Sequence, residues 1–133
     1  ATSLAQALGD QGDEVLVTQV VPHFDSDLPL VEEYREAMRL VRREGQFSFA
    51  SLEGYIAGRI LCLALAESPD APDRNTLVRA LLALGEFDLG LGVPLKLEKG
   101  HQQACHSVWP TIIQGGEVLP FDWKQLRPAT DGS

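Results

Sequence analysis

The segment from Leu52 to Glu67 is the feature that most constrains the fold of this chain. Its sequence predicts a helix whose large apolar side chains lie on nearly every face; they are Ile56, Ile60, Leu61, Leu63 and Leu65. A helix that is hydrophobic all round is packed between other elements of a fold. We therefore predict a buried helix, with Ser51 as its N-cap, that needs more neighbours than the rest of the chain obviously supplies.

The first part of the chain predicts an alternation of helix and strand. A short helix is expected over 3–8, and β-branched residues without a helical stripe predict a strand over 14–21. After a loop rich in Pro, Asp and Ser, an apolar stripe predicts a helix that starts near Leu28–Pro29, with Ser26 or Asp27 as its N-cap. This order of elements is typical of an α/β fold.

The second part of the chain changes from helices to short strands. A helix is predicted over 74–84, capped by Asp73 or Asn75 and ended by Gly85. Short strands are expected over 46–50, 87–91, 94–97, 107–113 and 117–120. The later strands are separated by glycine-containing turns, which predicts an antiparallel meander. Together the elements predict an α/β fold with a sheet flanked by helices on both faces.

The acidic composition restricts the partners that this chain can bind. Its 11 basic and 19 acidic residues give a net charge of -8, which disfavours nucleic acid because Lys and Arg supply most of that affinity. The longest apolar run, 60–66, is far shorter than the ~20 residues that span a bilayer. We recognise no signal peptide. Cys62 and Cys105 allow at most one disulfide, and Cys62 is expected to be a buried small hydrophobe.

Several segments, in this order, carry a resemblance to a known family: VTQVVP, PLVEEYREAM, FSFASLEGYIAGR, FDLG and GHQQACHSVWPTII. They are similar to the C-terminal portion of type I periplasmic binding proteins, nearest to the Leu/Ile/Val-type components of bacterial ABC transporters. The resemblance covers about 3–121. One departure is that Lys99 and Gly100 precede His101, where the family usually has an acidic residue.

The resemblance implies part of a two-lobed Venus-flytrap fold, with the N-terminal half missing and a periplasmic or extracellular location. It assigns 1–21 to the C-terminal lobe up to a hinge and 22–105 to the N-terminal lobe. Residues 106–133 then form the third crossover and the tail of the C-terminal lobe. The missing half would complete both lobes and would supply most of the contacts to the ligand.

The same resemblance places the start of the apolar helix at a ligand cleft, with Phe49, Ser51, Glu53 and Tyr55 as candidate ligand contacts. A helix N-terminus offers unpaired N–H groups and a positive dipole end to a carboxylate. The alternative is that Ser51 only caps the helix and that the aromatic residues belong to the core.

Two further segments, 18–22 and 108–111, are implied as the hinge on which the lobes close. A few residues at element ends absorb such closure, and prolines limit where the backbone bends. The alternative is a plain buried strand with a proline stop. Gln19 and His23 are weaker candidates for the rim of the ligand cleft. The hinge residues so assigned are Thr18, Val20, Pro22, Trp109 and Pro110.

Other groups of reactive residues do not form convincing sites. His101, Cys105 and His106 suit zinc by type but lack an evident fourth ligand, so no metal is expected. His23, Asp25 and Ser26 lie together in a proline-bounded loop, where neighbouring residues rarely converge as a triad. No glycine-rich phosphate loop follows a strand, so we expect neither a cofactor nor catalytic residues.

These observations favour a non-enzymatic carrier, the extracytoplasmic component of an ABC transporter that hands a branched-chain amino acid or a related amino acid or amide to a permease. The alternatives are the ligand-sensing domain of a signalling receptor and, third, a small α/β enzyme; the fold alone does not separate the first two. We also expect the chain to expose apolar surface along 52–67 and to associate with itself or with its missing half.

Overall fold

The computed structural model describes residues 2–41, 47–101 and 103–126. They form two compact units. Unit 1 takes in the described residues of 1–23 and 108–133, and unit 2 comprises 24–107. The chain therefore leaves unit 1 after His23 and returns to it at Val108.

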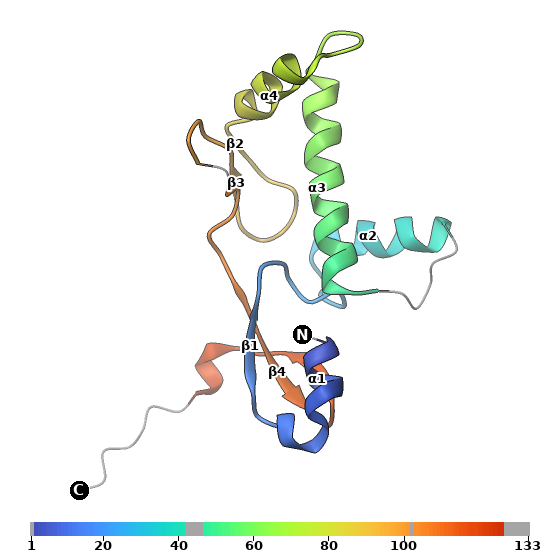
Figure 1. Ribbon diagram of the computed structural model, residues 1–133, viewed down its shortest axis with the longest axis vertical. Helices are drawn as coiled ribbons and strands as arrows, with labels where there is room; N and C mark the ends of the chain where they lie inside the picture. Colours follow the sequence, from blue (N-terminus) through green and yellow to red (C-terminus); the bar gives the residue numbers. More distant parts are fainter. Residues whose placement is uncertain (1, 42–46, 102, 127–133) are drawn as a thin grey trace, which may run out of the picture. The chain divides into compact units, whose positions relative to one another are not determined.

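Unit 1 is a three-stranded antiparallel sheet in the order β1–β4–β5, with a helix packed against β5 (Figure 1). Strands β4 and β5 are joined at Gly115 and Gly116, whose φ angles of 58° and 77° suit a two-residue hairpin turn that non-glycine residues adopt poorly. Its elements are α1 (Thr2–Leu8), the 3₁₀ helix η1 (Gly9–Gly12), β1 (Leu16–Gln19), β4 (Trp109–Gln114), β5 (Glu117–Pro120) and the 3₁₀ helix η2 (Trp123–Gln125).

The core of unit 1 is small and lies where α1 meets the sheet. Ala5, Ile113 and Val118 are buried there. The Asp13 carboxylate accepts a 2.7 Å hydrogen bond from the amide of Gly115, which ties the start of β1 to the β4–β5 turn. Two segments about a hundred residues apart in the sequence, the start of β1 and the β4–β5 turn, are therefore joined directly in unit 1.

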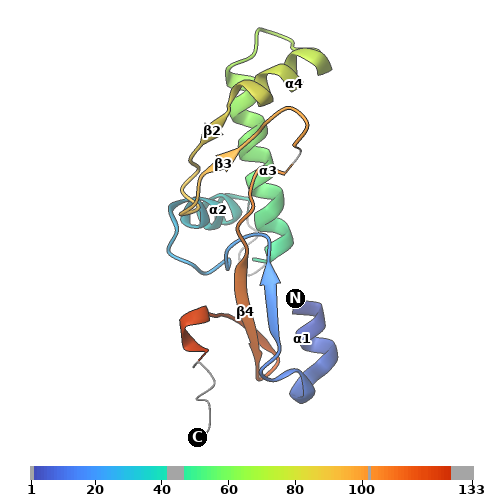
Figure 2. The same ribbon diagram turned by 90° about the vertical axis from the view of Figure 1, so that its left-hand side faces the viewer.

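The described residues of unit 2 form three helices and a two-stranded antiparallel ribbon (Figure 2). The predicted antiparallel strands are therefore present, but they form two separate sheets instead of one meander. The elements are α2 (Pro29–Leu40), α3 (Phe49–Ala66), α4 (Arg74–Ala83), β2 (Glu86–Phe87) and β3 (Leu95–Lys96).

The caps of the helices in unit 2 explain where each begins. The prediction for α4 is confirmed, because the Asp73 side chain accepts a 2.7 Å hydrogen bond from the amide of Thr76. The predicted caps of α2 are wrong: Leu28 occupies the N-cap without a side-chain bond, and Pro29 in the first turn fixes the start of the helix.

Helix α3 begins earlier than its apolar pattern indicates. Its N-cap is Ser48, and Ser51 lies in the first turn, so the assignment of Ser51 as N-cap is wrong. The strand predicted over 46–50 is also wrong where it is described, because Phe49 is already helical; Gln46 lies outside the described residues. Two serines three residues apart satisfy each other's backbone amides and so favour a helical turn over a strand.

Much of the apolar surface of α3 stays exposed. The described structure buries four of its residues, namely Phe49, Leu52, Ile56 and Ala64. Leu61 and Leu65 are 42% and 43% exposed, so the expected exposure of apolar surface is confirmed. Cys62 is exposed too, and the expectation that it is a buried hydrophobe is wrong because nothing described here covers that side of the helix.

By length and composition alone, α3 is also the one helix among the described residues that could cross a membrane. Core helices of soluble proteins pass the same test. Glu53 and Arg59 interrupt the apolar sequence of α3, and Arg59 forms an ion pair with α2.

Candidate functional site

The start of α3, where four ligand contacts are predicted, is held by a cluster of hydroxyl groups. The Ser51 hydroxyl lies 2.5 Å from that of Tyr34 and 2.9 Å from that of Ser48. The amide of Ser51 donates to the Ser48 side chain at 3.2 Å, and the amide of Ser48 donates to the Ser51 side chain at the same distance. The hydroxyl of Ser51 is therefore engaged in fixing the first turn of the helix.

Aromatic rings pack beneath this turn. Phe49 is buried and meets Phe24 edge to face, with ring centroids 5.1 Å apart. Tyr34, which is fully buried, contacts Phe47 and Tyr55 at centroid distances of 5.8 Å and 5.6 Å. Edge-to-face and tilted pairs of this kind add to the energy of burial. These ring contacts join the start of α3 to α2 and to the loop before α2.

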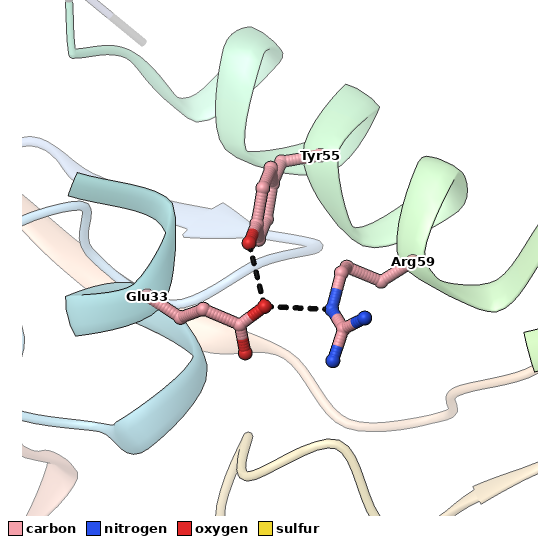
Figure 3. A network of polar contacts seen from close by, with 3 residues as sticks. All are labelled: Glu33, Tyr55 and Arg59. Atoms are coloured by element: carbon pink, nitrogen blue, oxygen red, sulfur yellow. Dashed lines mark hydrogen bonds and ion pairs between the residues drawn. The ribbon is translucent and has the colours of Figure 1, made fainter. Parts of the chain in front are cut away.

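Tyr55 belongs to a polar network that also joins α3 to α2 (Figure 3). Its hydroxyl donates a 2.7 Å hydrogen bond to Glu33 Oε1. Arg59 Nε lies 2.8 Å from the same oxygen, as an ion pair without the alignment of a hydrogen bond. Burial, followed by the hydrogen bond and the charge of Glu33, raises the pKa of Tyr55 to about 12.

The sequence analysis did not single out Glu33 and so missed this network. A usable signal was present, because Tyr55 and Arg59 are four residues apart and must share one face of a helix. Glu53, the remaining candidate on α3, is exposed. At this end of α3, Ser51 and Tyr55 are committed to contacts within unit 2, whereas the carboxylate of Glu53 faces outward.

The candidates in unit 1 are buried polar side chains. Gln19 Nε2 lies 3.4 Å from Thr111 Oγ1, and that hydroxyl donates a 2.7 Å hydrogen bond to the carbonyl of Val17. His23 Nε2 lies 2.9 Å from the carbonyl of Val118, and a carbonyl partner requires this nitrogen to carry the proton. Both side chains therefore link β1, and the loop after it, to the other two strands.

The two predicted hinge segments are direct neighbours in the sheet. Thr18 pairs with Pro110, and Gln19 pairs with Trp109, across the antiparallel β1–β4 ladder. Pro22 is buried, whereas Val20, between the strand and that proline, is 64% exposed. The structure thus pairs Thr18 with Pro110 in the sheet of unit 1 and places Val20 and Pro22 just after β1. The α3 candidates lie within unit 2.

The cysteines and histidines do not form a recognisable centre in the part of the chain that is described. There, no group of three or more His, Cys, Asp or Glu side chains is arranged to hold a metal ion. His101 forms an isolated bridge with Glu98, and Cys105 lies 3.9 Å from the carbonyl of Ser107.

Similar proteins were found among solved structures but not among family models or curated proteins. No family model and no curated protein matches this chain. A solved structure of a possible leucine/isoleucine/valine-binding protein from Rhodopirellula baltica SH 1 is 48% identical over 93% of this chain, with a TM-score of 0.85. An extracellular ligand-binding receptor from Verminephrobacter eiseniae is 25% identical over 89%, with a TM-score of 0.71.

A substrate-binding periplasmic protein from Ralstonia solanacearum shares the fold, with 22% identity over 80% of this chain and a TM-score of 0.68. This chain spans only 34% of the length of each of the first two structures and 31% of the third. It therefore matches one part of a longer fold. In sequence and in fold, this chain corresponds to a C-terminal part of a type I periplasmic binding protein.

Proposed function

We propose that this chain is part of the extracytoplasmic solute-binding component of an ABC transporter, with a branched-chain amino acid or a related amino acid or amide as its ligand. One observation carries the proposal: 48% identity over 93% of the chain, at a TM-score of 0.85, to a possible leucine/isoleucine/valine-binding protein. Because the chain spans about a third of that structure, the activity is proposed for the complete binding protein. Such a protein carries out no chemistry on its ligand.

The lobe assignment forms part of the proposal. Residues 22–105 would belong to the N-terminal lobe, and 1–21 with 106–133 to the C-terminal lobe and its crossovers. The chain passes between its compact units after His23 and before Val108, close to the residues proposed as the hinge. Paired strands resist bending within their ladder, so motion would concentrate just beyond it, at Val20 and Val108, which are both exposed.

The proposed ligand contacts on α3 divide into two roles. Glu53 is exposed, and its carboxylate suits the ammonium group of an amino acid. The positive end of the helix dipole suits the carboxylate, while the amide of Ser51 stays bonded to the Ser48 side chain. Phe49 and Ser51 would act by holding that turn in place, and Tyr55 by tying it to α2 through Glu33. Gln19 and His23 remain candidates for the rim of the cleft.

The proposal is tested by calorimetric titration of a complete binding protein. A suitable one is the Rhodopirellula chain in which the matching third is replaced by this sequence. We expect leucine, isoleucine and valine to bind, and aspartate and glucose not to bind. The substitution Glu53→Gln should weaken binding about tenfold or more, because it removes one charge-assisted contact. Glu86→Gln, an exposed carboxylate on β2, is the matched control. Binding of sugars, or of no amino acid, would overturn the proposal.

A further inference from the structure

One face of α3 is lined by small and aliphatic residues that the described structure leaves uncovered. These residues follow one another at spacings of three and four, so they share one side of the helix. All of them are exposed. We call them the α3 stripe: Ala50, Gly54, Gly58, Leu61 and Leu65.

The two glycines of the stripe have no explanation within the described residues. A Cβ added at Gly54 or at Gly58 would meet no atom within 4 Å. Glycine in the middle of a helix is less stable than alanine, so it needs a compensating reason. The usual reason is the close approach of another backbone, which a Cβ would prevent.

The stripe continues into an apolar groove of about 550 Å³ between α3, α4 and residues 97–101 and 104. Leu61 belongs to both, and Val78, Leu82 and Leu97 line the groove further on. Val78 is 46% exposed. A continuous apolar surface of this kind marks a contact with another macromolecule, and a small ligand in the groove would leave the glycines uncovered.

We propose that the α3 stripe and this groove form the docking surface for the part of the binding-protein fold that lies outside these 133 residues, whose backbone approaches α3 at Gly54 and Gly58. The related Rhodopirellula chain supplies the reason for this choice. It contains the same elements at a TM-score of 0.85, and this sequence spans only 34% of it. The inference rests on the fold, so failure of the proposed ligand binding would leave it standing.

Other occupants fit the surface less well. Lipid would gain little from glycines, and Glu53 and Arg59 lie on the same helix within the length that would have to cross the bilayer. A second copy of the chain would present the same stripe and groove. It is not needed to cover them, because the rest of the related Rhodopirellula fold can do so. The experiments below distinguish both occupants from the missing part of the fold.

The test compares the free 133-residue chain with a chimera in which this sequence replaces the matching third of the Rhodopirellula chain. Cys62 lies four residues after Gly58 and is exposed in the free chain, so its alkylation by iodoacetamide reports on cover over the stripe. Peptide mass spectrometry follows Cys62 and, as an internal comparison, Cys105. We expect Cys62 to react at least about tenfold more slowly in the chimera, since burial excludes the reagent.

Paired substitutions separate docking from helix stability. Gly58→Ala should raise the unfolding midpoint of the free chain, because it favours the helix, yet lower that of the chimera, because the added methyl group blocks close approach. Leu65→Glu should lower the midpoint of the chimera much more than Leu40→Glu, which replaces an 84% exposed leucine on α2. Equal effects of each substitution in both proteins would overturn the proposal.

The remaining outcomes also decide the question. A chimera that fails to fold, or in which Cys62 reacts as fast as in the free chain, contradicts the docking surface. A free chain that is dimeric by light scattering, and that Leu65→Glu makes monomeric, would assign the stripe to a second copy. Binding of the free chain to phosphatidylcholine–phosphatidylglycerol vesicles, lost in Leu65→Glu, would assign it to a membrane.

Discussion

The two halves of α3 differ in how much of their apolar surface the described chain covers. The N-terminal turns bury Phe49, Leu52 and Ile56, and they are fixed by the serine cap. The C-terminal half buries only Ala64 among its residues and leaves Leu61 and Leu65 open. The first half of α3 is therefore packed against other parts of this chain, whereas most of the second half is exposed.

The difference shows what an apolar helix needs besides its own sequence. Leucines occur along the whole of α3, but its polar and aromatic contacts with Tyr34 and Glu33 of α2 reach no further along the helix than Arg59. In the second half, α4 is the neighbouring helix, and none of its residues is buried. The apolar residues of α3 can therefore be buried only where another element of the chain packs against them.

The largest effect should come from shortening leucines in the two halves. Leu52→Ala should lower the free energy of unfolding of unit 2 by about 2–4 kcal/mol, because Leu52 is fully buried and its loss leaves a cavity. Leu65→Ala should change it by no more than about 0.5 kcal/mol, as exposed positions do. Urea unfolding followed by circular dichroism measures both. Similar losses for the two would show that the second half of α3 is covered in the free chain.

The cap at the start of α3 should have the next largest effect. Ser48→Ala should cost about 1 kcal/mol, since it removes an N-cap side chain and leaves the amide of Ser51 without its partner. The control is Ser68→Ala, which removes a 2.7 Å hydrogen bond to the carbonyl of Ala64 just beyond the other end of the helix. The same urea unfolding experiment shows which of the two substitutions lowers the free energy of unfolding more. A larger loss at Ser68 would contradict the idea that the first half is the anchored one.

The sequence predicted what depends on local pattern. The apolar stripe located α2, the Asp73 cap located α4, and the glycine pair located the β4–β5 hairpin. It misplaced the start of α3, because an apolar count begins at the first leucine, whereas the hydrogen bonds of Ser48 set the helix boundary. The N-cap could have been predicted from the sequence by considering Ser48 and Ser51 together as a capping box.

What the sequence could not predict depends on partners distant along the chain. Glu33 lies in the first turns of α2, where an acidic residue is common. Nothing in the local sequence reveals that its carboxylate contacts Tyr55 and Arg59. Gln19 and His23 were considered only as rim residues, yet their hydrogen bonds go to Thr111 and Val118, about a hundred positions away. Such contacts follow from packing, which local patterns do not encode.

The glycines in the exposed face of α3 should give a smaller effect of opposite sign. Gly54→Ala should stabilise the free chain by up to about 1 kcal/mol, because alanine favours the helix and its methyl group meets nothing. Gly90→Ala is the contrasting control and should destabilise, since Gly90 has a φ of 81° and a Cβ would lie 3.0 Å from the Pro29 side chain. Thermal unfolding distinguishes the two. A loss of stability at Gly54 would mean that α3 is already covered on this side.

The last effect is absent at neutral pH and concerns the dependence of stability on pH that the Glu33–Tyr55 contact gives to the first half of α3. The pKa of Tyr55 is raised from 10.0 to about 12 in the folded chain, chiefly by burial and then by Glu33. A raised pKa means that folding favours the protonated hydroxyl. This contribution to stability is therefore complete below pH 10 and is lost as the pH rises from 10 to about 12.

Absorbance at 295 nm measures this titration, and the chain has only two tyrosines, so the spectrum of Tyr55→Phe subtracted from that of the unsubstituted chain isolates Tyr55. Glu33→Gln should move the midpoint of that difference down towards 10, because it removes the negative charge and leaves Arg59, which lowers the pKa of Tyr55. A midpoint that Glu33→Gln leaves unchanged would show that Glu33 and Tyr55 do not meet. The first half of α3 would then be held by its serine cap and its aromatic rings, without help from the carboxylate of α2.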